Sequence, residues 1–252
     1  MTGCAGAPVE RTPASSVNWA GSQRQAVHDG DVGAKVRLSD LAMQPHLYAL
    51  GPLEGLTGEI TVLDGKAAIS TVVNGRVHTG TGLDHGAAFL VWIHAAVWTA
   101  TPLPANVKTM EQLAAYLPAA ARSAGFEGTA PFAFRIEGTV QTLDYHVLNR
   151  TPGTPFTAEA HEASKAHFAL ADRRVHLVGF YSTQHRGVFM PGTSNIHIHG
   201  VTDDGLLAGH VESFTLAPGA ALLFPTSAEQ TPGAAVGTGK PSRHAAETPH
   251  LP

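Results

Sequence analysis

Charged residues and cysteine are both scarce in this 252-residue chain. Asp, Glu, Lys and Arg make up only 14% of it and the formal net charge is −4, so no basic surface favours nucleic acid or anionic lipid. The single cysteine, Cys4, excludes an internal disulfide and a zinc site built from thiolates. The longest apolar run, residues 87–98, is too short to cross a bilayer and indicates a buried strand. This composition favours a small neutral or acidic substrate in a pocket.

Cys4 lies in a segment of small residues, Gly3-Cys4-Ala5-Gly6. This segment resembles the mature start of a bacterial lipoprotein, in which the cysteine carries a lipid. Two localisations therefore stay open: cytoplasmic, or exported and anchored by a lipid on Cys4.

Turn signals and apolar alternation predict a chain with many strands and few helices. Two Asx-Gly dipeptides, the strongest short-range hairpin signals, predict a meander over residues 59–78. The strongest helix signal covers residues 109–124, which begin with a capping box and are followed by Gly125. Shorter helices are expected over 18–28 and 38–43. Further strands are expected over 87–98, 132–148, 167–170, 175–181 and 214–224, the last range as a pair that turns at 218–219.

The ends of the chain differ in composition from its middle. Residues 1–16 are rich in small residues and proline, and we expect them to be flexible. Residues 225–252 contain almost no large apolar side chain that could offset the entropy of ordering, so we expect a disordered tail. The folded part is predicted to be one domain over residues 17–224.

The stretch 194–212 predicts a β-hairpin that carries three histidines. His197 and His199 are two residues apart on one strand, so their side chains share a face. A turn centred on 204–205 sets His199 opposite His210, whereas a turn one residue earlier sets His197 opposite His210. Both loops place the three imidazoles on one face, and a three-residue loop would turn His210 away.

Three imidazoles without a fourth protein ligand nearby are typical of a zinc site that leaves a position for water or substrate. Directly opposed Cβ atoms lie roughly 4.5–5.5 Å apart, which is close enough for one ion. Imidazole sites also accept nickel, copper or iron, so another divalent metal stays open. The alternative is that a chain with 15 histidines gathers three on a surface hairpin by chance.

Motifs between Ala26 and Phe224 resemble those of the acetolactate decarboxylase family. The matching segments are 28–31 (HDGD), 58–65 (GEITVLDG), 135–139 (RIEGT), 178–180 (VGF), 188–192 (VFMPG) and 209–211 (GHV), the end of the histidine hairpin. The resemblance implies an α/β fold of the α+β type, with few helices and mixed or antiparallel sheets. Two β-rich lobes, expected over 17–130 and 131–224, would face each other across the metal site, and the protein would form a homodimer.

The resemblance also implies a zinc-dependent carbon-carbon lyase. Such an enzyme converts acetolactate, or a related 2-hydroxy-3-keto acid, into CO₂ and an acetoin-type product. His197, His199 and His210 take the roles of metal ligands, and the metal polarises the substrate's oxygens. Glu59 matches the family's acid glutamate, which protonates carbon. The alternative reading of Glu59 is an exposed carboxylate on a hairpin.

Two features depart from the family pattern. His146 stands where the family has a catalytic arginine, and a histidine cannot offer a permanent bidentate fork to a carboxylate. Arg135 or Arg186 could reach the pocket instead. The family's second catalytic glutamate corresponds to the C-terminal tail, where Glu229 and Glu247 are the candidates.

These departures leave two other functions open. One is a zinc hydrolase or isomerase on the same scaffold, in which the metal activates water and His146 or His185 acts as a base. The other is a metal- or small-ligand-binding protein without decarboxylase activity.

Overall fold

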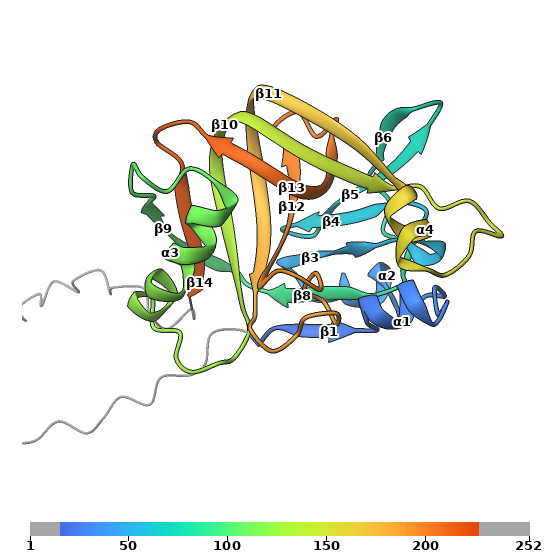
Figure 1. Ribbon diagram of the computed structural model, residues 1–252. Helices are drawn as coiled ribbons and strands as arrows, with labels where there is room; N and C mark the ends of the chain where they lie inside the picture. The colour runs from blue at the N-terminus through green and yellow to red at the C-terminus, as the bar shows by residue number, and fades with distance from the viewer. Residues whose placement is uncertain (1–15, 227–252) are drawn as a thin grey trace, which may run out of the picture.

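The computed structural model describes residues 16–226, which form two six-stranded sheets packed against each other (Figure 1). All strand pairs are antiparallel. This confirms the expectation of a β-rich fold with few helices, and of the two expected kinds of sheet, mixed or antiparallel, the structure has the antiparallel kind. No helix within the described residues is long and apolar enough to cross a membrane.

The first sheet is built from the N-terminal part of the chain. Its strand order is β1-β8-β3-β4-β5-β6. The strands are β1 (Asn18–Ala20), β3 (Leu47–Pro52), β4 (Glu59–Leu63), β5 (Lys66–Val73), β6 (Arg76–Gly80) and β8 (Leu90–His94). Two short strands, β2 (Val36–Arg37) and β7 (Gly86–Ala87), pair separately beside it.

The second sheet closes partly on itself. Its strands are β9 (Val97–Pro102), β10 (Phe132–Leu148), β11 (Lys165–Tyr181), β12 (Ile196–Thr202), β13 (Ala208–Leu216) and β14 (Ala221–Thr226). Strand β10 pairs with β11, β11 with β12, β12 with β13, and β13 again with β10. These four strands form a closed ring whose apolar side chains, among them Tyr145, Val147 and Val211, are buried in one cluster.

Four helices and one 3₁₀ turn connect the strands. They are α1 (Gln23–His28), α2 (Leu38–Leu41), the 3₁₀ turn Glu54–Leu56, α3 (Met110–Ser123) and α4 (Ala158–Ala163). Thr109 caps α3 in the predicted capping box, and Gly125 follows with φ +91°. Pro118 lies inside α3, and the helix continues past it to Ser123.

The predicted meander is confirmed as β4, β5 and β6. Its turn residues Asp64 and Asn74 have φ values of 51° and 50°, and the glycine after each is also at positive φ. Two consecutive residues at positive φ are the requirement of the tight hairpin turn that Asx-Gly dipeptides satisfy.

Four predicted elements were wrong in detail. The expected strand 87–98 is two main strands, β8 and β9, because the chain passes from the first sheet to the second between them. The expected helix 18–28 is β1 followed by α1. The two strands expected over 167–181 are one strand, β11, which continues through Asp172 at φ 51°. The expected pair over 214–224 does not pair with itself, because β13 and β14 both bond to β10, one after the other.

The expected segment boundaries differ from the observed elements at two places. Strand β9 precedes the expected lobe boundary at residue 130 but belongs to the second sheet. Strand β14 reaches Thr226, two residues beyond the expected end of the domain. Residues 1–15 and 227–252 of the expected flexible segment and tail lie outside the described residues. They include Cys4, Glu229 and Glu247.

Candidate metal centre

The histidine hairpin has the first of the two predicted registers. His199 of β12 lies opposite His210 of β13, as a turn centred on Asp204-Gly205 requires. Gly205 has φ +71°, a conformation that glycine adopts without strain. His197, two residues before His199, points to the same face.

The same face carries a row of histidines across all four strands of the ring. His146 of β10 lies opposite His210, and His167 of β11 lies opposite His146. Opposed residues share a face of a sheet, so the order across the row is His199, His210, His146, His167. This face is turned away from the ring's apolar interior and toward the first sheet.

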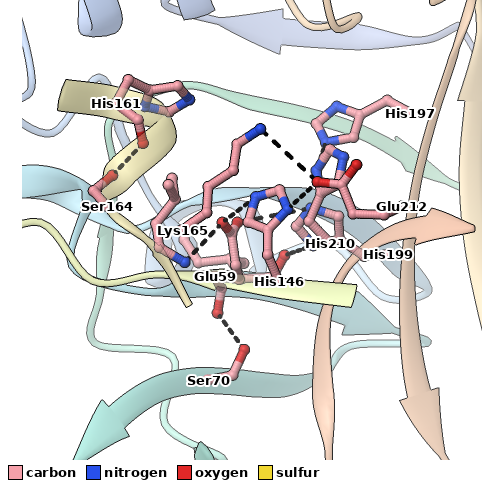
Figure 2. A network of polar contacts seen from close by, with 12 residues as sticks. Glu59, Ser70, His146, His161, Ser164, Lys165, His197, His199, His210 and Glu212 are labelled. Atoms are coloured by element: carbon pink, nitrogen blue, oxygen red, sulfur yellow. Dashed lines mark hydrogen bonds and ion pairs between the residues drawn. The ribbon is translucent and has the colours of Figure 1, made fainter. Parts of the chain in front are cut away.

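The first sheet contributes Glu59, the first residue of β4, to this site (Figure 2). Its carboxyl is only 2% exposed. One oxygen lies 3.7 Å from Nε2 of His199, and the other lies 3.7 Å from Nε2 of His146. The backbone N–H of Leu148 donates to the carboxyl at 3.4 Å. Glu59 therefore lies between two histidines, the predicted metal ligand His199 and His146.

Two of the predicted ligands are oriented by backbone carbonyls. Nδ1 of His197 donates to the carbonyl of Phe189 at 2.7 Å, and Nδ1 of His199 donates to the carbonyl of Ile60 at 2.9 Å. A neutral ring that donates from Nδ1 presents a lone pair at Nε2. Carbonyl partners of this kind are the usual means by which proteins hold metal-binding histidines in one tautomer.

The three imidazoles are neutral. Burial lowers the pKa of His197 to about 4 and the pKa of His199 well below its ordinary value. Burial also lowers the pKa of His210 well below its ordinary value, and the neighbouring histidines add to this effect. Neutral imidazole is the form that binds a metal ion.

The donor atoms fit a divalent transition metal. One nitrogen from each of His197, His199 and His210 lies within 4.8 Å of the others, and Nε2 of His197 is 3.1 Å from Nδ1 of His210. Nitrogens bound at about 2.0–2.1 Å to a tetrahedral ion lie about 3.3 Å apart. Nε2 of His199 is buried and has no hydrogen-bond partner among the described residues. Such an atom costs about 1–3 kcal/mol unless a ligand satisfies it.

A second set of donors, His146, His210 and Glu212, also lies within 4.8 Å. Here Nδ1 of His146 already donates to Oε1 of Glu212 at 2.5 Å. This bond satisfies two of the three groups, so the three-histidine set is the stronger candidate.

Burial sets the protonation state of Glu59. It raises the pKa of Glu59 to about 8, although the hydrogen bond from Leu148 and the charge of Lys165 act in the opposite direction. The carboxyl is thus protonated at neutral pH in the metal-free protein. A buried protonated carboxyl beside a polar cavity is a candidate general acid.

His146, Glu212 and Lys165 form a polar chain beside the histidines. Burial lowers the pKa of His146 more than Glu212 raises it, and the hydrogen bond from His146 lowers the pKa of Glu212. Nζ of Lys165 lies 2.7 Å from Oε2 of Glu162 and 3.8 Å from Oε1 of Glu212. With Nδ1 of His146 held by Glu212, its Nε2 faces Glu59.

These groups line a cavity of about 280 Å³, here called the inner cavity. Its ionisable wall residues are Glu59, His146, His161, Lys165, His197, His210 and Glu212, and its apolar wall includes Pro52, Phe89, Leu148, Phe189 and Ile196. Figure 2 shows His161 of α4 beside Lys165, on the opposite side from the hairpin.

The other residues considered from the sequence lie elsewhere. The guanidinium of Arg135 is 5.2 Å from the ring centroids of both Tyr48 and Trp98, and it pairs with Glu137. At about 3.3 Å per residue, the 11 residues from Arg135 to His146 span roughly 36 Å along β10. The geometry therefore does not support the predicted role of Arg135 in the pocket. Nδ1 of His185 lies 2.7 Å from the hydroxyl of Ser182, outside the inner cavity's wall.

Glu212, Lys165 and His161 were missed by the sequence reasoning. Glu212 was detectable, because it lies two residues after His210 and shares its face. Lys165 would have required the β10–β11 register, in which it lies opposite Leu148. His161 has no strand periodicity to mark it, since it lies on the short helix α4.

Comparison with known proteins gives a family match and fold matches. The family model for alpha-acetolactate decarboxylase matches residues 21–228. A Staphylococcus aureus protein, described as of unknown function and similar to alpha-acetolactate decarboxylase, matches with 18% identity over 83% of this chain and 84% of its own, at a TM-score of 0.65. The alpha-acetolactate decarboxylase of Bacillus subtilis strain 168 matches with 15% identity over 84% and 86%, at a TM-score of 0.67. A comparison with curated proteins gives no match.

The neutral histidines predict that the metal-free protein loses stability in acid. The pKa of His161 and that of His197 are both about 4 in the folded protein, and unfolding returns each to about 6.5. The unfolded chain therefore binds protons that the folded chain does not, and the free energy of unfolding falls as the pH falls from 6.5 to 4. Glu59 has the opposite sign: its raised pKa makes stability fall as the pH rises from 4.5 to 8.

Urea unfolding of metal-free protein between pH 4.5 and 8 measures both effects. Because several rings outweigh one carboxyl below pH 6.5, we expect maximal stability near pH 6.5. His161→Gln should flatten the acid side, and Glu59→Gln should flatten the alkaline side. A free energy of unfolding that stays constant from pH 6.5 to 4.5 would contradict the neutrality of the buried rings.

Proposed function

The chain belongs to the alpha-acetolactate decarboxylase family, and we propose that it is a metal-dependent carboxy-lyase acting on acetolactate or a related 2-hydroxy-3-keto acid. The observation that carries the proposal is that two complementary groups lie side by side at the inner cavity, Glu59 on its wall and His199 buried directly behind it. Nε2 of His199 is buried without a partner, and the protonated carboxyl of Glu59 lies 3.7 Å from it. A decarboxylase of this kind needs both an electron-withdrawing centre and a proton donor.

The three hairpin histidines would hold the metal. A divalent ion bound there would supply a Lewis acid that polarises the substrate's oxygens. Zinc is the ion we propose, because three neutral imidazoles are a common zinc donor set and the chain offers no second cysteine.

Glu59 is the proposed acid of the reaction. When the bond to the carboxylate carbon breaks and CO₂ leaves, the electron pair stays on the substrate carbon and must take a proton. The Glu59 carboxyl lines the inner cavity, and in the metal-free protein burial keeps it protonated at neutral pH. His146 presents Nε2 to Glu59 at 3.7 Å, which is beyond hydrogen-bond distance but close enough for His146 to relay a proton to the carboxyl between turnovers.

Lys165 supplies the positive charge that the sequence lacks at position 146. Its ammonium group lies on the wall of the inner cavity, with Glu162 at 2.7 Å as its nearest acidic partner. We propose that it attracts the anionic substrate, a role for which a neutral His146 is unsuited. The apolar wall formed by Leu148, Phe89 and Phe189 then favours loss of the charged carboxylate as neutral CO₂.

Acetolactate turnover tests this function directly. Metal-loaded protein should release CO₂ and acetoin from racemic acetolactate, whereas metal-free protein and His199→Ala should show only the uncatalysed background rate. His78→Ala, which changes a histidine on β6 outside the cavity wall, is the matched control and should keep full activity. Absence of product from fully metal-loaded wild-type protein would reject the proposal and favour a ligand-binding protein without turnover.

Replacing Glu59 separates its role as acid from metal binding. Glu59→Gln keeps the shape of the side chain and removes its proton, so we expect kcat to fall about 10²–10⁴-fold at unchanged metal content. The wild-type rate should also decline as the pH rises, because Glu59 loses its proton, with an apparent pKa of about 8 or lower. This decline should vanish in Glu59→Gln. Glu127→Gln, on a surface loop, controls for the lost charge. Unchanged kcat in Glu59→Gln would remove Glu59 from the mechanism.

A further inference from the structure

The inner cavity adjoins a second cavity of about 490 Å³, here called the outer cavity. The two share wall residues from α1, α4, the start of β11 and the loop between β11 and β12: Gln23, His161, Lys165, Pro191 and Thr193. A ligand in the inner cavity can therefore extend past Lys165 into the outer one. Acetolactate, with a single carboxylate and a short carbon chain, has no group that would reach there.

Two arginines lie on the wall of the outer cavity. Arg24 belongs to α1, and Arg186 belongs to the loop after β11. The backbone N–H of Arg24 donates to the carbonyl of Gly187 at 2.9 Å and holds α1 against this loop. A Cβ placed on Gly187 would lie 3.6 Å from Nη2 of Arg24. The guanidinium of Arg24 is thus beside the residue that follows Arg186.

Neither arginine has an acidic partner within 4 Å among residues 16–226. Nε of Arg186 donates to Oδ1 of Asn195 at 2.9 Å, which orients the guanidinium. Glu162 is the one acidic residue on the outer cavity's described wall, and it pairs with Lys165. Within the part of the chain that the structure describes, the two guanidinium groups therefore line the outer cavity with uncompensated charge.

We propose that Arg24 and Arg186 form a subsite for a second anionic group of the substrate, a carboxylate or a phosphate. This inference rests on the proposed function, because it places the hydroxy-keto acid end of the same substrate in the inner cavity. Arginine presents a planar fork of donors that matches either anion. The substrate class is then a dianionic 2-hydroxy-3-keto acid, larger than acetolactate.

Equilibrium binding of simple anions tests the subsite without any turnover. The probes are valerate, with one carboxylate, glutarate, with two, and 3-phosphonopropionate, with a carboxylate and a phosphonate. Each is titrated calorimetrically into the full chain at fixed metal content and ionic strength. The variants are Arg24→Gln, Arg186→Gln and, as a matched control for charge, Arg76→Gln on β6.

Glutarate or 3-phosphonopropionate should bind wild-type protein at least about 10-fold more tightly than valerate. In Arg24→Gln and in Arg186→Gln this preference should fall about 10-fold, because each variant loses one hydrogen bond to a charged group. The control variant Arg76→Gln should keep the preference. Preference for glutarate alone identifies a carboxylate subsite, and preference for the phosphonate alone identifies a phosphate subsite.

Equal binding of all three probes would contradict the proposed subsite. A loss of preference in Arg76→Gln as large as that in Arg24→Gln and Arg186→Gln would also contradict it. The result is independent of catalysis. Absence of CO₂ release from acetolactate would count against decarboxylation of that substrate and would leave the measured anion preference intact.

Discussion

The site depends on three imidazoles that are kept neutral by burial on one face of a hairpin. Backbone carbonyls of Phe189 and Ile60 fix the rings of His197 and His199, so the nitrogens left over point into a common space. The Ile60 carbonyl comes from the first sheet, one residue after Glu59, and its bond to His199 joins the two sheets. The same contact that orients the ligand therefore also places the proposed acid beside it.

The alternation of side chains between the two faces of a strand made the centre of the site predictable. Period-two alternation and an even-length turn were enough to place the three imidazoles on one face, because register in a tight hairpin follows from loop length. The sequence left two registers open, and the structure has the one in which His199 lies opposite His210. The meander over β4 to β6 was predictable for the same reason. Pairing between strands distant in sequence was not. The β10–β11 and β10–β13 registers bring Lys165 and Glu212 to His146, and no local pattern encodes those registers.

The same limit explains the errors in the fold. Residues 87–98 form an apolar run broken only by His94, yet the chain changes sheets within it, and a change of sheet leaves the local hydrophobic pattern unaltered. Arg135 was a reasonable substitute for a missing arginine by residue type. Its strand is long, however, and carries it to the Tyr48 and Trp98 rings at the far end. In this divergent family member, positive charge reaches the cavity from β11 through Lys165.

The account's central claim is that three imidazoles bind one metal ion and leave a position for substrate. X-ray absorption spectroscopy at the metal edge of zinc-loaded protein tests this claim most directly. We predict three imidazole nitrogens at about 2.0–2.1 Å and one lighter, exchangeable oxygen ligand, with one imidazole lost in His199→Ala. Fewer than three imidazoles in the wild-type protein, or a spectrum that His199→Ala leaves unchanged, would contradict the account.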